Sequence, residues 1–252
     1  TTGVRDPVTS ALHIILGKRV DLDIAQLVRW RKTRSSVEEE EEACIRYAAS
    51  FAGYGFYGDV VSESEKLRWM GPKRYDVAGT KVFLEHRSYE AEVDYLEVES
   101  EKPGTRGANN CRANCSVCSS GSDRTTAAAG GRKWSRSRGS FLSIGAAIIS
   151  CRNEKAPDGL VAEAHLSDGF LHLLLIRDCP RPSYLWHLIQ IARRGGDPLD
   201  FRFIEHHKTP VFTFKSLGGK EGVWNVDGEI FSAHQLSAQV FRGLVSLFAT
   251  GP

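Results

Sequence analysis

A glycine-rich segment that leads into a short charged helix constrains this chain more than any other feature. Residues 53–58 read GYGFYG, and Asp59 follows directly. Glycine carries no Cβ, so it permits tight backbone turns and close approach of other groups. Ser62 and Glu65 have the spacing of a capping box, which predicts a helix that begins at Ser62 and ends near Gly71. We therefore expect an acidic side chain just before a helix, where a ligand can approach the backbone.

The predicted helix carries a cluster of charges. Glu65 and Arg68 are three residues apart, so their side chains share one face of a helix, and Arg74 follows at its exit. A carboxylate beside basic side chains suits a site that binds a hydroxyl and a polyphosphate together. From the residues alone, a glycine-bent strand end followed by a solvated, charged helix explains the segment equally well.

Most of the chain has the pattern of β structure, and the expected fold class is α+β, mainly antiparallel and β-sandwich-like, with a few accessory helices. Helices are expected at 8–16, 75–87 and 184–193, the last with Leu185, Leu188, Ile189 and Ala192 on one side. Strands are expected at 19–29, 44–51, 89–99, 141–150, 160–166, 170–177, 201–206, 211–216, 222–226 and 239–248. Asp168-Gly169 predicts a hairpin turn, with His165 at the surface.

Residues 101–138 differ in composition from the rest. They are rich in Gly, Ser, Arg, Asn and Thr with little periodicity, which predicts a long irregular insertion. The basic run 132–138 at its end is expected to be a solvated loop, and its Trp134 suggests contact with an anionic membrane surface.

The insertion contains three cysteines, Cys111, Cys115 and Cys118, with the spacing CxxxCxxC. Zinc would need a fourth ligand, from Cys151, Cys179 or a histidine. An iron–sulfur cluster shares this spacing, but the β-rich sequence that follows does not fit the barrels that carry such clusters. Reactive thiols and plain free thiols are the remaining alternatives. We favour the interpretation that these cysteines bind a structural metal ion.

Composition excludes several classes of protein. The 252 residues carry a net charge of only +2, so the protein as a whole does not attract nucleic acid electrostatically. The longest apolar run, 141–149, is too short to span a bilayer, and no signal peptide is recognised. Six cysteines, three of them crowded together, are not a secreted disulfide framework, so we expect a reducing, cytoplasmic location. The chain starts at Thr1 and its only methionine is Met70, which we interpret as an excerpt of a longer protein.

The glycine-rich segment resembles the fourth signature block of the diacylglycerol-kinase-like lipid kinases, the family that includes sphingosine and ceramide kinases. GYGFYGD and CxxxCxxC are most similar to the ceramide-phosphorylating branch. The similarity runs with gaps over the whole chain. It implies a nucleotide-binding α/β lobe, of which residues 1–17 would be the tail, and a lipid-binding β-sandwich lobe over 18–252.

The resemblance also implies roles for individual residues. Arg68 and Arg74 would grip phosphate oxygens of ATP, and Glu65 would orient one of these arginines. Asp59 would lie at the lipid headgroup. A second acidic block, Asp227-Gly228-Glu229, would help to hold ATP and Mg²⁺, although Asp-Gly between strands is also the commonest hairpin signal.

The function implied is ATP-dependent phosphorylation of the primary hydroxyl of ceramide at a membrane surface. Sphingosine kinases carry a second aspartate two places after the first, where this chain has Val61. An apolar residue there suits a neutral amide better than an ammonium group. The block that supplies the catalytic base would precede Thr1, so the excerpt alone is expected to be inactive. Alternatives are a sphingosine or diacylglycerol kinase, a metal or iron–sulfur protein built on the cysteines, and a non-catalytic lipid-binding domain. Such a domain would not need Arg68, Arg74 and Asp227 together.

Overall fold

A computed structural model describes residues 6–34, 39–98, 133–218 and 222–249 of the chain. Its helices are α1 (Pro7–Ile15), α2 (Phe56–Glu65), α3 (Arg74–Glu85) and α5 (Arg181–Ala192), with a 3-10 helix η1 (Arg68–Lys73). Its strands are β1 (Arg19–Arg34), β2 (Glu39–Ala48), β3 (Phe51–Gly55), β4 (Tyr89–Leu96), β5 (Trp134–Ala147), β6 (Leu171–Arg177), β7 (Ile204–Thr209), β8 (Val211–Ser216), β9 (Trp224–Val226), β10 (Glu229–Phe231) and β11 (Gln235–Phe248).

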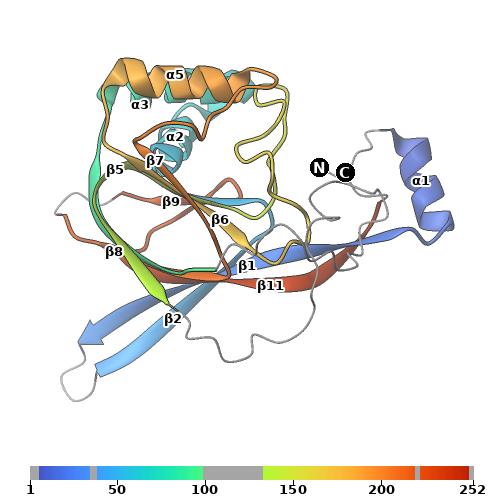
Figure 1. Ribbon diagram of the computed structural model, residues 1–252, viewed down its shortest axis with the longest axis horizontal. Helices are drawn as coiled ribbons and strands as arrows, with labels where there is room; N and C mark the ends of the chain where they lie inside the picture. Colours follow the sequence, from blue (N-terminus) through green and yellow to red (C-terminus); the bar gives the residue numbers. More distant parts are fainter. Residues whose placement is uncertain (1–5, 35–38, 99–132, 219–221, 250–252) are drawn as a thin grey trace.

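The strands form one curled antiparallel sheet of eleven strands (Figure 1). Its main path has the order β10-β9-β3-β5-β4-β8-β11-β1-β2, and β6 and β7 branch from it at β5. The long strand β5 permits this branch because it pairs with β4 through its first half, and with β3 and β6 through its second half. Helices α2, α3 and α5 lie together on one side of the sheet, and α1 stands apart beyond the end of β1 (Figure 1). An α+β, mainly antiparallel fold is confirmed.

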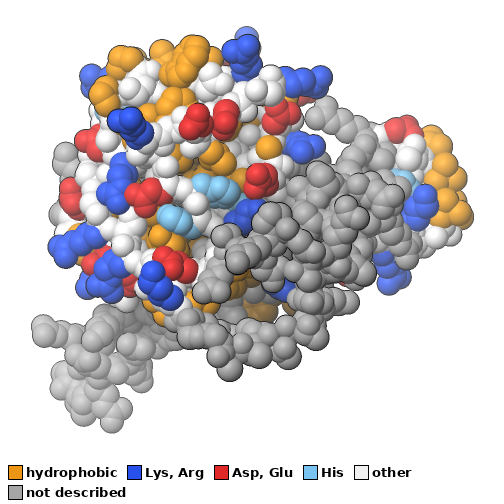
Figure 2. Space-filling model, in the orientation of Figure 1, with side chains coloured by type: hydrophobic (Ala, Val, Ile, Leu, Met, Phe, Trp, Pro, Cys, Tyr) orange, Lys and Arg blue, Asp and Glu red, His pale blue; other side chains and the backbone are white. Residues whose placement is uncertain are grey.

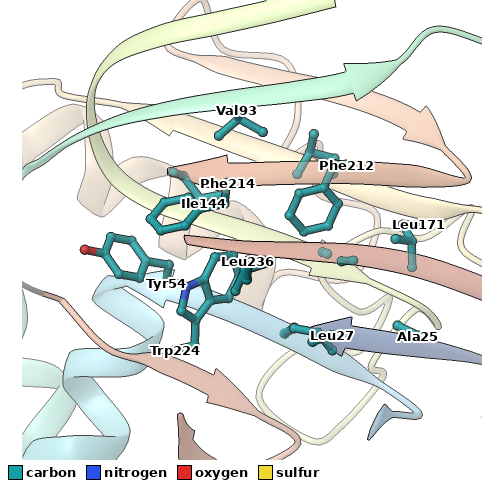
Figure 3. Close-up of a cluster of buried hydrophobic side chains, with 14 of the residues drawn as sticks. Ala25, Leu27, Tyr54, Val93, Ile144, Leu171, Phe212, Phe214, Trp224 and Leu236 are labelled. Carbon is teal, nitrogen blue, oxygen red and sulfur yellow. The ribbon is translucent and has the colours of Figure 1, made fainter. Parts of the chain in front are cut away.

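The main core lies within the curl of the sheet (Figure 3). Tyr54 of β3 is 1% exposed, and its ring centroid is 4.7 Å from that of Phe214 and 5.5 Å from that of Trp224. Each large aromatic side chain buried in this way contributes about 1.5–3 kcal/mol. Since β3 leads directly into α2, the core anchors the strand that positions the candidate site.

Several elements lie where local sequence patterns predict them. Helix α1 ends before Gly17, which has a φ of +63°, and strands β6 and β8 match the predicted ranges closely. The strand expected at 201–206 lies three residues later, as β7. The strand expected at 44–51 is interrupted at 49–50, so that it forms the end of β2 and the start of β3.

The start of the charged helix was predicted wrongly. Helix α2 begins at Phe56, directly after Gly55, and it ends at Glu65. Ser62 therefore lies inside the helix and does not cap it, and Asp59 lies in the first turn instead of before it. The capping-box spacing was misleading because the chain turns from β3 into the helix at Gly55. Glycine readily adopts the φ of +71° found there, and the helix begins without a side-chain cap.

The basic run is also not a loop. Residues 134–138 are the first part of β5 and pair with β4, with Asp94 opposite Arg136 and Leu96 opposite Trp134. Arg136 donates from Nε to Asp94 Oδ1 at 2.6 Å. Cross-strand pairs of opposite charge stabilise a strand whose own sequence is too polar to predict β structure. Residues 134–138 therefore do not belong to an irregular insertion, and residues 101–132 of the predicted insertion lie outside the described residues.

No strand forms at 160–166. The segment folds into turns, since Leu160 N–H donates to the Ser150 carbonyl and Ala164 N–H to that of Val161. Four of its apolar residues are buried without being extended: Leu160, Val161, Ala164 and Leu166. Asp168-Gly169 consequently does not join two strands, and His165, expected at the surface, is only 7% exposed.

The buried face of α5 differs from the predicted one. Tyr184 and His187 are the buried residues of the helix, whereas Leu185 and Ile189 are 45% and 41% exposed. Hydrophobic side chains are accordingly visible at the surface over α5 (Figure 2). Among the helices in the described ranges, none combines the length and hydrophobicity needed to cross a bilayer.

Candidate active site

The glycines of the segment bring α2 close to the sheet. A Cβ on Gly55 would lie 2.5 Å from the Leu142 carbonyl oxygen, and a Cβ on Gly58 would lie 1.8 Å from that of Val223. Neither position tolerates a larger residue without backbone movement. The glycines therefore permit close approach, as expected, but the groups that approach them belong to the same chain: Leu142 of β5 and Val223, the residue before β9.

Asp59 projects from the first turn of α2 and is half-buried. Its Oδ2 accepts a hydrogen bond from the Tyr89 hydroxyl at 2.6 Å. Burial raises the pKa of the Asp59 carboxyl above its usual range, against the opposing effects of the Tyr89 hydrogen bond and of nearby Arg87. Val61 lies farther along the same helix and is 8% exposed, so an aspartate in its place would be largely buried.

Glu65, Arg68 and Arg74 form one cluster. Arg68 donates from Nε to Glu65 Oε2 at 2.6 Å, which confirms the spacing argument for this pair. Arg74, at the start of α3, lies 3.4 Å from Glu65 Oε1, so that one carboxylate contacts both arginines. Gly71, with a φ of +61°, breaks the helical path between them and turns Arg74 back towards Glu65. The Arg68 side chain is 73% exposed and that of Arg74 20% exposed, so Arg68 is the more accessible to a ligand.

Asp227 and Gly228 form the tight turn between β9 and β10, and both have positive φ angles. The Asp227 carboxylate is occupied by donors of the β2–β3 connection. Its Oδ2 accepts from Ala49 N–H at 2.6 Å, and its Oδ1 accepts from the N–H groups of Ser50 and Phe51 and from the Ser50 hydroxyl. Glu229, the next acidic residue, is exposed.

Three sequence-predicted groups therefore lie on neighbouring elements. Asp59 and Glu65 are six residues apart on α2, which separates them by about 9 Å along the helix. The Asp227 turn is attached to β3 through β9, because Ala52 pairs with Val226. Each group is held by different partners: Asp59 by Tyr89, Glu65 by the two arginines, and Asp227 by residues 49–51.

The cysteines Cys111, Cys115 and Cys118 lie outside the described residues. Within the described part, no group of three His, Cys, Asp or Glu side chains could hold a metal ion. Of the proposed fourth ligands, Cys151 and Cys179 are free thiols. Burial raises their pKa values to about 12 and about 11, which keeps both protonated at neutral pH.

Sequence reasoning missed two partners of the site residues. Tyr89 appeared only as the start of an alternating strand, and Ser50 only as part of a continuous one. Both contacts join residues far apart in the chain, and no local spacing signals them. The interruption of the strand at 49–50 follows from the hydrogen bonds to Asp227.

Comparison with known proteins supplies an independent view. The family model described as the ceramide kinase C-terminal domain matches residues 50–218. The chain is 61% identical to a ceramide kinase of Arabidopsis thaliana, and the match covers 100% of this chain and 44% of that protein. It is 33% identical to human ceramide kinase, of which it covers 52%, and 26% identical to a sphingosine kinase of Arabidopsis thaliana, of which it covers 51%.

The fold has a solved counterpart. A crystal structure of a candidate diacylglycerol kinase from Bacillus anthracis superposes with a TM-score of 0.53 at 11% identity, over 95% of this chain and 60% of that one. At this identity the likeness concerns the fold alone. The chain spans about half the length of the curated relatives that it matches.

Proposed function

The chain belongs to the ceramide kinase C-terminal domain family, and we propose that it is the C-terminal part of an ATP-dependent lipid kinase that phosphorylates the primary hydroxyl of ceramide. The single observation that carries the proposal is that Asp59 and the cluster of Glu65, Arg68 and Arg74 lie on adjoining helices inside the matched span. Residues 1–17 would be the tail of a nucleotide-binding lobe, and 18–252 the lipid-binding lobe.

Phosphoryl transfer depends mainly on positioning and on neutralising charge at the phosphates. We assign Arg68 and Arg74 to the phosphate oxygens of ATP. Glu65 holds both guanidinium groups by one carboxylate, which limits their motion before ATP binds. A planar guanidinium donates two parallel hydrogen bonds to phosphate, which suits this role.

Residues 227–229 are assigned to the nucleotide side of the site. Because the Asp227 carboxylate already accepts four hydrogen bonds, its contribution is to fix the turn that presents Gly228 and Glu229. Mg²⁺ is usually held by one or two carboxylates together with substrate phosphates. The exposed Glu229 carboxylate fits such a role, and the bound ion would neutralise phosphate charge.

Ceramide is preferred over sphingosine as the substrate because Val61 stands where sphingosine kinases carry their second aspartate. The buried position of Val61 supports this choice, since a carboxylate there would need a positive partner such as the sphingosine ammonium. Diacylglycerol is the remaining competitor within this class.

A cytoplasmic location with peripheral membrane contact is part of the proposal. The cysteines in the described ranges, Cys44, Cys151 and Cys179, are free thiols, which suits a reducing compartment. Membrane contact would rest on Trp134, which is 50% exposed, because Lys133 and Arg136 of the same run face the acidic side chains Glu97 and Asp94.

The decisive experiment measures transfer of labelled phosphate from ATP by the chain joined to the N-terminal region that its relatives carry. Ceramide, sphingosine and diacylglycerol are compared side by side. We expect strong labelling of ceramide, lost in Asp59→Asn and reduced in Arg68→Ala. Equal labelling of sphingosine would contradict the assignment of the lipid, and turnover by the chain alone would contradict the need for an upstream lobe.

Zinc at Cys111, Cys115 and Cys118 remains a separate prediction. Metal analysis of the purified protein should find zinc in an amount that Cys115→Ser lowers, and the protein should be colourless. Brown protein with iron would indicate a cluster instead. Absence of both metals would leave the cysteines as free thiols.

A further inference from the structure

The hydrogen bond between Tyr89 and Asp59 connects β4 to α2. Tyr89 is the first residue of β4 and is 4% exposed, and its ring packs edge-on against Tyr54 with 5.3 Å between centroids. Its hydroxyl donates to Oδ2 of Asp59 at 2.6 Å. A short bond from a buried, rigidly packed ring fixes the carboxylate in one orientation.

The other carboxylate oxygen of Asp59 has no hydrogen-bond partner among the described residues. The charged groups that influence this carboxylate come from the end of α3 and the turn after it: Arg87 stabilises the charged form and Glu85 opposes it. These two side chains are paired with each other, at 2.8 Å between Arg87 and Glu85. Neither of them replaces a direct donor to Oδ1.

We propose that Tyr89 is a positioning residue, which holds Asp59 by Oδ2 so that Oδ1 accepts the amide N–H of ceramide. The inference rests on the proposed function, and it adds the atom that is recognised and the residue that orients the acceptor. A carboxylate that is partly desolvated needs hydrogen bonds to both oxygens. Tyr89 provides one, and a neutral lipid amide provides the other.

An amide N–H suits this acceptor for a further reason. A carboxylate and an N–H form a charge-assisted hydrogen bond, which is about twice as strong as a neutral one. Diacylglycerol carries ester oxygens at the corresponding position and has no N–H to donate. The bond would therefore select ceramide over diacylglycerol, whereas Val61 concerns the choice between ceramide and sphingosine.

The test combines a variant with a modified substrate. Tyr89→Phe keeps the ring and its contact with Tyr54 but removes the hydroxyl that holds Asp59. N-methyl ceramide keeps both hydrocarbon chains and the primary hydroxyl but lacks the amide N–H. The kcat/KM values of the wild type and of the variant are measured with both lipids, in the protein that includes the upstream lobe. The four values give the coupling between the Tyr89 hydroxyl and the amide N–H of the lipid.

We expect N-methylation to lower kcat/KM of the wild type at least about tenfold, the usual effect of losing one hydrogen bond to a charged group. In Tyr89→Phe the same methylation should lower kcat/KM only about two- to threefold. Without the Tyr89 hydroxyl, the Asp59 carboxylate is not held in place and distinguishes less well between the amide N–H and the N-methyl group. Tyr95→Phe is the matched control. Tyr95 lies on the same strand and is similarly buried, but its ring stacks on His207, and it should keep the wild-type ratio.

The outcomes separate the two proposals. If the wild type phosphorylates ceramide and Tyr89→Phe lowers turnover of both lipids by one common factor, Tyr89 has a structural role and the inference is wrong. An unchanged wild-type rate on N-methyl ceramide would also overturn it. If the wild type does not phosphorylate ceramide, the proposed function and the inference that rests on it both fail.

Discussion

Asp227 Oδ1 accepts two hydrogen bonds from Ser50, one from its backbone N–H at 3.1 Å and one from its hydroxyl at 2.6 Å. The pair joins the β9–β10 turn to the β2–β3 connection, across 177 residues of chain. Asp227 adopts a φ of +49°, which costs energy for a non-glycine residue. The hydrogen bonds to the carboxylate offset this cost and hold the turn beside β3.

Asp227→Asn should lower the free energy of unfolding by about 1–3 kcal/mol, because an amide has one acceptor oxygen and no charge, so it loses charge-assisted hydrogen bonds to residues 49–51. Urea unfolding of the chain measures the difference. Glu229→Gln, two residues later and exposed, is the control and should change stability by less than about 0.5 kcal/mol. Equal stability of Asp227→Asn and the wild type would show that the carboxylate is not structural.

Gly58→Ala should destabilise the fold by about 1–3 kcal/mol, because the new Cβ would lie 1.8 Å from the Val223 carbonyl oxygen and push α2 away from β9. Gly79→Ala is the matched control in α3, where the structure shows nothing within 4 Å of the new Cβ. That change should stabilise the chain by about 0.5–1 kcal/mol through the better helix propensity of alanine. Thermal unfolding of the two variants should therefore shift in opposite directions.

Arg68→Ala and Arg74→Ala should each raise the KM for ATP about tenfold, as expected for the loss of one charge-assisted contact to phosphate. Their KM for ceramide should stay unchanged. The unfolding free energy of Arg68→Ala should differ from the wild type by less than about 1 kcal/mol, because an exposed ion pair such as Glu65–Arg68 contributes little to stability.

Lys66→Ala is the control for these arginine variants. Lys66 is another exposed cation on the same stretch of chain, and it pairs with Glu63 instead of Glu65. It should leave the KM for ATP unchanged. A similar rise in this variant would mean that general positive charge, and not the arginine cluster, attracts ATP.

His206 makes stability depend on pH. Burial, together with neighbouring His172 and Lys208, lowers its pKa from 6.5 to about 4, while Glu163 opposes this shift. The unfolded chain therefore binds a proton at this residue below about pH 6.5, and the folded chain does so only near pH 4. Stability should fall as the pH decreases through this window.

The free energy of unfolding, measured at steps between pH 7 and pH 4, tests this in the wild type and in His206→Gln. The wild type should lose stability more steeply than the variant, because glutamine does not titrate. Parallel curves would show that His206 is protonated in the folded protein as easily as in the unfolded chain.

Local patterns account for the elements that sequence analysis predicted well. Val211 to Ser216 alternates in burial as the sequence alternates, and β8 has the predicted ends. Glu65 is the last residue of α2 and Arg68 the first residue of η1, and their pairing follows from the spacing of three residues across the turn between them. In such cases neighbours within a few residues carry enough of the energy to define the structure.

Long-range partners explain the errors. The first part of β5 looked like a loop because Arg136 and its neighbours are polar, and Asp94 of β4 supplies the pairing that makes it a strand. The apolar residues at 160–166 indicated burial correctly but not conformation, because turns can bury side chains as strands do. Periodicity reports which residues avoid water, and it does not report which element carries them.

The sequence by itself determined the antiparallel α+β class, the glycine-rich entry to α2 and the Glu65–Arg68 pair, because these depend on backbone sterics, alternation and helical spacing over short distances. Only the tertiary structure decided that Arg74 joins Glu65, that Tyr89 holds Asp59, and that Asp227 is bound to the β2–β3 connection. Each of these contacts forms only when the chain turns back and brings distant groups within hydrogen-bonding or ion-pair distance. A hydrogen bond or an ion pair depends on distance and direction in space, which spacing along the chain does not encode.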